Sequence, residues 1–216
     1  KKCGNAAYHH SKRGKLMQRG TLTVVSGPAG VGKGTVIKEA IAKADGRIYL
    51  SVSATTRAPR PGDIENVTYY FKSREEFEKM IKDEEILEWA IYSDNYYGTP
   101  KKPVFDALEK GIDVILEIEV QGAMTVRAHH PEAVFVFIVP PSEEELECRL
   151  RGRDTEPPEE IQKRLEIAKT ELGYIEKYNF VVVNHSVEQA SNDLLTIMRA
   201  DKLTKERYLT AIADLR

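Results

Sequence analysis

Five short runs of apolar, mostly β-branched residues recur along the chain, and longer helical patterns separate them. The runs are Leu22–Val25, Ile48–Val52, Val114–Ile118, Val134–Val139 and Phe180–Val183. Most are apolar almost without interruption, as is typical of strands that are buried on both faces of a sheet. Strands that alternate with helices form a parallel sheet that the helices cover. The sequence therefore predicts an α/β fold, with a parallel sheet and helices on both of its faces.

Three segments carry the signature of a helix start. In each, a Ser is followed three positions later by Glu or Gln, as in Ser73–Glu76, Ser142–Glu145 and Ser186–Gln189. In such a capping box the Ser oxygen accepts from the third amide of the helix, and the later side chain reaches back to the Ser amide. We therefore expect helices to begin at these positions. A further long helical pattern covers Glu159–Tyr178.

A glycine-rich segment with one lysine links the first apolar run to the helical pattern Val36–Ala44. Glycines allow backbone N–H groups to turn toward phosphate oxygens, and the following helix adds the positive end of its dipole. Lys33 can then reach the β- and γ-phosphates of a nucleoside triphosphate. A strand before and a helix after are the context that this phosphate-binding loop, the P-loop, requires. The candidate ATP-binding residues here are Gly27, Pro28, Ala29, Gly30, Val31, Gly32, Lys33, Gly34 and Thr35.

One position departs from the usual P-loop pattern. The residue after Lys33 is usually Ser or Thr, whose hydroxyl ligates Mg²⁺, but here it is Gly34. Two alternatives stay open: Thr35 replaces that hydroxyl, or Mg²⁺ is held mainly by nucleotide oxygens and water. We expect Mg²⁺ as the cofactor that accompanies ATP, with Thr35 as a candidate phosphate or metal contact.

The charge balance narrows the class of partner. The 216 residues contain 32 Lys and Arg against 34 Asp and Glu, a formal net charge of −2, whereas binding to nucleic acid needs an excess of basic side chains on one face. No apolar run approaches the roughly 18 residues of a membrane span. The two cysteines form no framework. We expect a protein that binds neither nucleic acid nor membrane and that lies in the reducing cytoplasm.

The first residues differ in composition from the rest of the chain. Residues 1–19 contain several Lys and Arg, no acidic residue and no periodic apolar pattern. We expect a disordered basic tail there. Met17 would serve as an initiator, which makes residues 1–16 vector sequence or an upstream extension.

Two internal segments interrupt the alternation of strands and helices. Residues 54–100 are rich in Pro, Gly, Tyr and Arg and are expected to form a small α+β insert. Residues 149–164 place arginines around a glycine before a Pro pair, which indicates a lid within the core. The core would comprise residues 20–53 and 101–216. Strand-like pieces of the insert are Val67–Phe71 and Leu87–Tyr92.

Six blocks follow one another in a fixed order between about residues 20 and 205. They are the P-loop, Ser53-Ala-Thr-Thr-Arg-Ala-Pro-Arg-Pro-Gly62, Glu88-Trp-Ala90, Asn95-Tyr-Tyr-Gly-Thr-Pro100, Leu116-Glu-Ile-Glu-Val-Gln-Gly122 and the arginine-rich lid. Each block alone has an ordinary explanation, since surface Arg pairs and strand Tyr residues are common. Together they make the chain resemble the guanylate kinase family. The resemblance implies a P-loop NTPase fold and transfer of the γ-phosphoryl group of ATP to GMP, giving ADP and GDP in purine nucleotide metabolism, with dGMP left open as an acceptor.

The resemblance also implies that the insert binds GMP. The family's GMP phosphate contacts match Arg57, Arg60 and Tyr69, with Tyr97 beside them, and its guanine contacts match Ser53, Glu88, Thr99 and Glu119. The chemistry supports Glu88 as the base reader, because guanine presents N1–H and N2–H donors that a carboxylate accepts as a pair. Adenine presents an acceptor at N1 instead, and a polar site of this kind can reject the wrong ligand by about 10⁴-fold.

Two carboxylates end the third apolar run. Glu117 and Glu119 are two positions apart, so in a strand both would lie on the same side. Ligands in such sheets bind beyond the carboxyl ends of the strands. By the resemblance, Glu117 would lie near Mg²⁺ or its water shell and Glu119 near guanine. A solvated strand end is the alternative.

The lid supplies the remaining candidate residues. Arg149, Arg153 and Arg164 match arginines that close over the triphosphate in the family, and Asn184 matches a position near adenine. The family commonly reads G-R-G-T-E here, whereas this chain has Asp154 after Arg153. The extra negative charge would tune how the lid opens.

The expected catalysis needs no general base. The second pKa of a phosphate monoester is about 6, so the attacking oxygen of GMP is largely ionised at pH 7. The enzyme must align two polyanions and cancel their charge. We expect Lys33, Arg57, Arg153 and Arg164 to be the catalytic residues.

Two other functions compete with this interpretation. One is a different nucleoside monophosphate kinase, since Gly-Lys-Gly-Thr also occurs in adenylate kinase-like loops; the insert with Glu88 argues against it. The other is a noncatalytic, peptide-binding domain like those of membrane-associated scaffold proteins, which typically have a degraded P-loop. The intact P-loop and lid arginines argue against that. The sequence does not distinguish a monomer from a homodimer.

Overall fold

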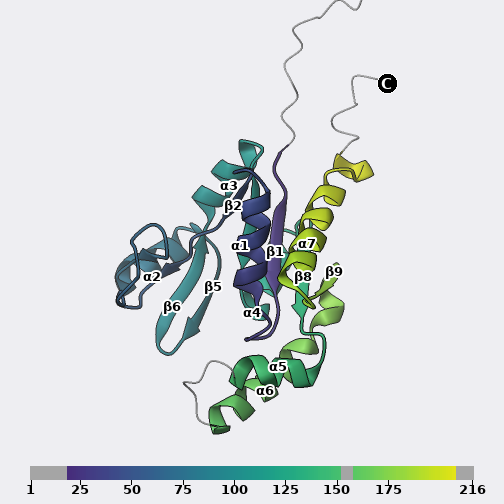
Figure 1. The fold of residues 1–216 in the computed structure, drawn as a ribbon. Helices are drawn as coiled ribbons and strands as arrows, with labels where there is room; N and C mark the ends of the chain where they lie inside the picture. The colour runs from purple at the N-terminus through teal and green to yellow at the C-terminus, as the bar shows by residue number, and fades with distance from the viewer. Residues whose placement is uncertain (1–18, 152–157, 208–216) are drawn as a thin grey trace, which may run out of the picture.

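The computed structural model describes residues 19–151 and 158–207, and a five-stranded parallel sheet forms its centre (Figure 1). The strand order is β2-β7-β1-β8-β9, and every pairing is parallel. The strands are β1 (Leu22–Ser26), β2 (Ile48–Leu50), β7 (Asp113–Glu117), β8 (Val134–Val139) and β9 (Phe180–Val183). The α/β fold predicted from the five apolar runs is therefore confirmed.

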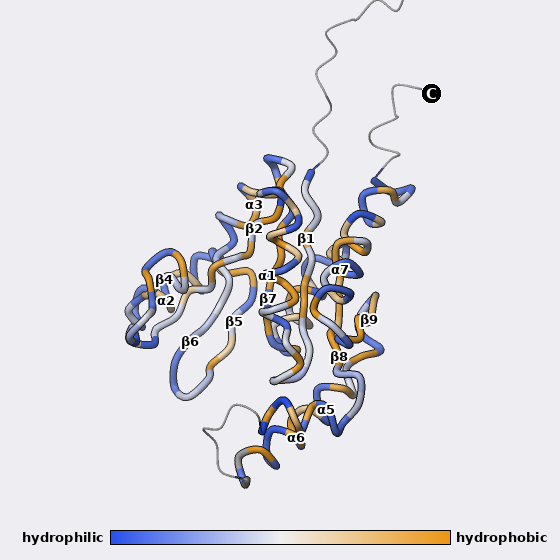
Figure 2. The backbone as a smooth tube through the Cα atoms, viewed as in Figure 1, coloured by the Kyte–Doolittle hydropathy of each residue, from blue (hydrophilic) through white to orange (hydrophobic). Residues whose placement is uncertain are grey.

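Helices cover both faces of this sheet, and a hydrophobic cluster fills each interface. Val25 belongs to the cluster under α1 and α7, and its neighbour Val24 to the cluster under α3 and α4, because successive side chains of a strand point to opposite faces. Figure 2 shows hydrophobic stretches along α1, α7 and β8. The four helices are α1 (Lys33–Lys43), α3 (Lys101–Glu109), α4 (Val120–His129) and α7 (Val187–Asp201).

Strand β9 departs from the expected burial on both faces. Val182 is 2% exposed, but Phe180 and Val181 are 41% and 48% exposed. The reason is that β9 is the last strand of the sheet and pairs with β8 on one side only. An apolar strand at the edge of a sheet has the same composition as a buried one, so the expectation was wrong for this run.

A second sheet lies within the segment predicted as an insert. Its strand order is β4-β3-β6-β5, and Phe77 of helix α2 packs against it with Ala54 and Ile86. The predicted strand Val67–Phe71 is shorter than expected, since only its last two residues pair as a strand. The elements are β3 (Ala54–Thr55), β4 (Tyr70–Phe71), α2 (Arg74–Lys82), β5 (Ile86–Tyr92) and β6 (Asn95–Pro100).

The predicted helix starts are present. Ser73 forms a complete capping box with Glu76, while the hydroxyls of Ser142 and Ser186 accept from the amides three residues later. These residues precede α2, α5 (Glu143–Arg151) and α7.

Two helices follow β8 and pack near the P-loop: α5 (Glu143–Arg151) and α6 (Pro158–Leu172). The helical pattern Glu159–Tyr178 is interrupted after Leu172 by Gly173 and continues as a short 3₁₀ helix, Ile175–Lys177. Within residues 19–151 and 158–207, no helix has the length and apolarity to cross a bilayer.

Candidate active site

The backbone of the P-loop depends on glycine at three positions between β1 and α1, and the first is Gly27, where an added Cβ would lie 2.2 Å from the Ile138 carbonyl oxygen. Gly30 and Gly32 have φ angles of 87° and 88°, in the left-handed region that residues with side chains rarely adopt. The surroundings also leave no room for a side chain. An added Cβ would lie 2.7 Å from Leu150 of α5 at Gly30, and 2.8 Å from Nδ2 of Asn184 at Gly32. The loop is therefore fitted against both α5 and the end of β9.

Lys33, the first residue of α1, folds back over the loop. Its ammonium group donates to the carbonyl of Gly27 and, at 3.2 Å, to that of Pro28. These contacts hold a positive charge beside the N-terminus of α1, where the first amides of a helix have no partner within it. Such an arrangement favours a bound phosphate.

Asn184 and Arg149 brace the same loop from two other elements. Asn184 is 3% exposed, and its Nδ2 donates to the carbonyl of Val31 at 2.7 Å. Arg149 of α5 donates to the Asn184 carbonyl at 3.0 Å and forms an ion pair with Glu145 at 2.8 Å. Both residues thus contact the P-loop or its neighbour Asn184, and the Asn184 amide nitrogen donates to the loop. The expected places of Asn184 near adenine and of Arg149 over the triphosphate stay predictions.

Glu117 ends β7 beside the P-loop. Its Oε1 lies 3.6 Å from the Cβ that a side chain at Gly34 would have. Burial raises the pKa of Glu117, the charge of Lys33 lowers it, and the charge of Glu119 raises it. The strand stops at Glu117, and Glu119 is the N-cap of α4. The prediction that both carboxylates lie on one side of the same strand is therefore wrong.

This arrangement suits Mg²⁺. The ion takes oxygen ligands, keeps several waters, and in such sites is held by one or two carboxylates together with substrate phosphates. Glu117 supplies one oxygen donor at the loop. Within residues 19–151 and 158–207, no group of three or more His, Cys, Asp or Glu side chains could hold a metal ion. One carboxylate at the loop fits an ion whose other ligands are phosphate oxygens and water.

Glu171 of α6 was not predicted from the sequence, although its carboxyl lies beside that of Glu119. Burial and the negative charge of Glu119 raise the pKa of Glu171 to about 7, against the opposing effect of Lys33. A Glu within a helical pattern carries no local signal of such a contact, which arises only because α6 packs near the start of α4.

A second cluster of candidate residues lies around Arg57 in the insert. Arg57 belongs to the loop between β3 and β4, residues 56–69, which we call the arginine loop. The Arg57 guanidinium pairs with Asp63 at 2.9 Å, with the two side chains 11% and 12% exposed. It also lies over the ring of Tyr69, 5.3 Å from its centroid, and Tyr69 contacts Tyr97 edge to face at 6.1 Å. The structure thus brings together three of the residues expected at the GMP phosphate.

A role for Asp63 was not predicted from the sequence. Its carboxylate accepts from Arg57 and, at 2.7 Å, from the backbone amide of Arg60. The Arg60 amide and then the Arg57 guanidinium lower the pKa of Asp63, and Asp63 in turn raises the pKa of Arg57. A single carboxylate therefore orders both the side chain and the backbone of the arginine loop.

The expected base reader, Glu88, lies on β5 and is 6% exposed. Its Oε1 accepts from the Thr99 hydroxyl of β6 at 2.7 Å. Burial raises the pKa of Glu88, and the bonds from Thr99 oppose that rise. Two of the residues expected in the guanine pocket are therefore in direct contact.

The remaining predicted residues lie as follows. Ser53 precedes β3, and its carbonyl accepts from Tyr70. The Arg60 side chain is exposed, and Arg164 lies on α6, partly exposed. Arg153 and Asp154 lie outside the described residues, so their expected place in the lid stays a prediction.

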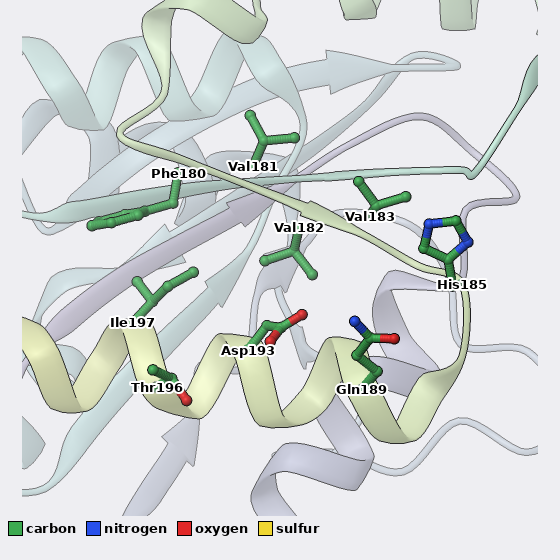
Figure 3. Close-up of a pocket in the computed structure, with 9 residues that line it drawn as sticks. All are labelled: Phe180, Val181, Val182, Val183, His185, Gln189, Asp193, Thr196 and Ile197. Atoms are coloured by element: carbon green, nitrogen blue, oxygen red, sulfur yellow. The ribbon is translucent and has the colours of Figure 1, made fainter.

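A separate groove of about 500 Å³ lies between β9 and α7 (Figure 3). Phe180 and the three valines of β9 form one side, and Gln189, Asp193, Thr196 and Ile197 of α7 the other. It contains none of the predicted site residues.

The parallel sheet, the glycine loop between β1 and α1, and Lys33 define a P-loop nucleotide-binding protein. The sequence profile of guanylate kinases matches residues 19–201, and on this match the chain belongs to the guanylate kinase family. The chain is 53% identical to a guanylate kinase of Halalkalibacterium halodurans, over 89% of this chain and 94% of the relative. It is 51% identical to one of Carboxydothermus hydrogenoformans, over 88% and 93%. The crystal structure of guanylate kinase from Anaplasma phagocytophilum superposes with a TM-score of 0.69 and 34% identity, over 88% of this chain and 90% of that one.

Proposed function

We propose that this chain transfers the γ-phosphoryl group of ATP to GMP and releases ADP and GDP. The observation that carries the proposal is the buried Glu88 carboxyl, bonded to Thr99 within the insert, in a chain whose P-loop is intact. The P-loop suits a triphosphate, and the buried carboxyl suits a base with two adjacent N–H donors. Guanine is such a base, and the relatives named as guanylate kinases support the same choice.

Two groups of residues would hold the two nucleotides. ATP would lie against the nine P-loop residues, with Arg149 and Asn184 beside them and Arg153 and Arg164 closing from the lid. GMP would lie in the insert, its phosphate at the arginine loop and its base at Glu88. The proposed GMP contacts are Ser53, Arg57, Arg60, Tyr69, Glu88, Tyr97, Thr99 and Glu119.

The residues act by orienting and neutralising charge. The GMP phosphate is largely dianionic at pH 7, so no side chain has to remove a proton. Lys33 would leave its two carbonyl partners for the phosphates of ATP, and Arg57 would hold the acceptor phosphate in line. Mg²⁺, when bound, supplies positive charge to the phosphate oxygens; Glu117, and Thr35 as the nearest hydroxyl in sequence, are the residues that would hold it. Closure of the insert and lid would keep water from the γ-phosphate.

We propose that the reaction takes place in the cytoplasm, with ATP and GMP as its two substrates. Neither a monomer nor a homodimer is preferred. The proposal allows dGMP as a second acceptor, because none of the proposed site residues is assigned to the ribose 2′-hydroxyl.

The test is production of ADP by the purified chain with ATP, Mg²⁺ and each of GMP, dGMP, AMP, CMP and UMP. Turnover is expected with GMP and not with AMP, CMP or UMP. Lys33→Ala should lower kcat by about 10²–10³-fold, as removal of one preorganised donor does elsewhere. The matched control is Lys82→Ala, an exposed lysine of α2, which should leave kcat unchanged. Equal turnover with AMP would refute the base assignment, and no turnover with any acceptor would refute the proposed reaction.

A further inference from the structure

Helix α4 of the main sheet touches the Glu88 carboxyl of the insert, and the contact falls at a glycine. Gly122 is the third residue of α4. A Cβ built on it would lie 2.5 Å from Oε2 of Glu88 and 3.2 Å from Cδ, whereas carbon atoms in good contact with their neighbours are about 3.5–4.0 Å away. A methyl group at position 122 would therefore collide with the carboxyl.

The backbone of Gly122 gives no other reason for a glycine. Its φ is not among the positive φ values of the described residues, and it lies inside a regular helix, where alanine is the more favourable residue. Gly122 itself is buried. The feature that excludes a side chain is the Glu88 carboxyl.

The carboxyl is also the part that would move. Val120 and Ala123, on either side of Gly122, are 5% and 0% exposed and belong to the core cluster under α4, so the helix is held in place. The far end of the Glu88 side chain can rotate, but only by leaving the Thr99 hydroxyl that its Oε1 now accepts from. A methyl group at 122 would thus turn the carboxyl and spare the fold.

We propose that Gly122 is a specificity-determining residue: its missing side chain creates the space in which Glu88 presents its oxygens to the base of the acceptor nucleotide. The inference rests on the proposed function and deepens it. It makes α4, a helix of the main sheet, one wall of the base pocket that the insert provides.

The first experiment compares Gly122→Ala with the wild type. We expect kcat/KM for GMP to fall at least tenfold, mainly through KM, while KM for ATP and the Tm stay within the range of the control. The preference for GMP over inosine monophosphate, which lacks the N2–H donors, should also fall at least fivefold. The matched control is Thr125→Ala, an exposed position of the same helix, which should change none of these. An unchanged KM for GMP and an unchanged preference would overturn the inference, as would loss of the fold.

A second experiment separates a contact with Glu88 from a general effect on α4. Asp at position 88 is one methylene shorter and withdraws the carboxyl from Gly122. In the Glu88→Asp background, Gly122→Ala should cost less than threefold in kcat/KM for GMP. An equal cost in both backgrounds would overturn the inference. If the wild type turned over no acceptor, the proposed function would itself be wrong, and if Glu88→Gln left GMP use intact, another residue would read the base. If Glu88→Gln impaired GMP use and Gly122→Ala did not, only this inference would be wrong.

Discussion

At the scale of the residue, the Glu88 carboxyl is poorly suited to its surroundings without a ligand. It is 6% exposed, and burial raises its pKa despite the bonds from Thr99. A base with two N–H donors would stabilise the charged form, whereas a glutamine would set an NH₂ group against one of those donors. We expect Glu88→Gln to lower kcat/KM for GMP by about 10²-fold or more and to leave KM for ATP unchanged, as steady-state kinetics with each substrate varied would show.

The same carboxyl predicts how stability depends on pH. Native Glu88 keeps its proton to a higher pH than the unfolded chain does, where the pKa is about 4.5. Its favourable contribution to folding is therefore complete below that value and is lost as pH rises through the raised native pKa. The Glu88→Gln variant should exceed the wild type in Tm at pH 8, and the difference should shrink toward pH 4. Thermal unfolding of both proteins across this range measures the effect; a difference that stays constant with pH contradicts it.

At the scale of the element, the arginine loop between β3 and β4 is ordered by Asp63, which binds both the Arg57 side chain and the Arg60 amide. A binding group that is already positioned loses less conformational entropy when its ligand arrives. We expect Asp63→Ala to raise KM for GMP about tenfold with kcat within threefold of the wild type, and Asp63→Asn, which keeps an acceptor for the amide, to raise it less.

Steady-state kinetics at saturating ATP test this prediction. The control is Asp83→Ala at the end of α2, where the exposed ion pair with Lys79 has no relation to the loop. A fall in KM for GMP in Asp63→Ala would contradict the positioning role and show that Asp63 competes with the phosphate for Arg57.

The elements themselves were largely predictable, because their signals are local. The runs Val134–Val139 and Phe180–Val183 coincide with β8 and β9, and Ser73 caps α2 as its spacing with Glu76 indicates. What failed was the exposure of β9, since an apolar tetrapeptide does not reveal whether a further strand will pair with it. The predicted length of the strand Val67–Phe71 was wrong for a related reason, because only Tyr70 and Phe71 pair with a neighbouring strand.

At the scale of the whole molecule, the least predictable residues are those that act across segments distant in sequence. The need for glycine at position 122 comes from the Glu88 carboxyl, 34 positions earlier. The raised pKa of Glu171 comes in part from Glu119, 52 positions earlier. Neither contact leaves a periodic or spacing signal. By contrast, the P-loop, Arg57 and Glu88 could be proposed from sequence because each belongs to a compact block, although their roles with nucleotides stay predictions. Packing of α4 against β5, and of α6 near the start of α4, thus determines the part of the site that sequence blocks do not show.

The P-loop and the Glu88–Thr99 pair lie on different sheets, although α4 borders the base pocket, and this makes a prediction for the molecule as a whole. The P-loop lies at the parallel sheet, and the Glu88–Thr99 pair and the arginine loop lie in the second sheet (Figure 1). Each ligand should therefore stabilise the chain independently. At about 100 times its Kd, a ligand adds about 2.7 kcal/mol to the free energy of unfolding, which raises Tm by about 5–10 °C in a protein of this size.

The Lys33→Ala variant should lose the increase in Tm with ATP and Mg²⁺ but keep the increase with GMP, and Glu88→Gln should do the reverse. Thermal shift curves for both variants and for Lys82→Ala, which should keep both rises, test this. Loss of both rises in either single variant would show that the two sites form only together, and that the two sheets bind nucleotide as one unit.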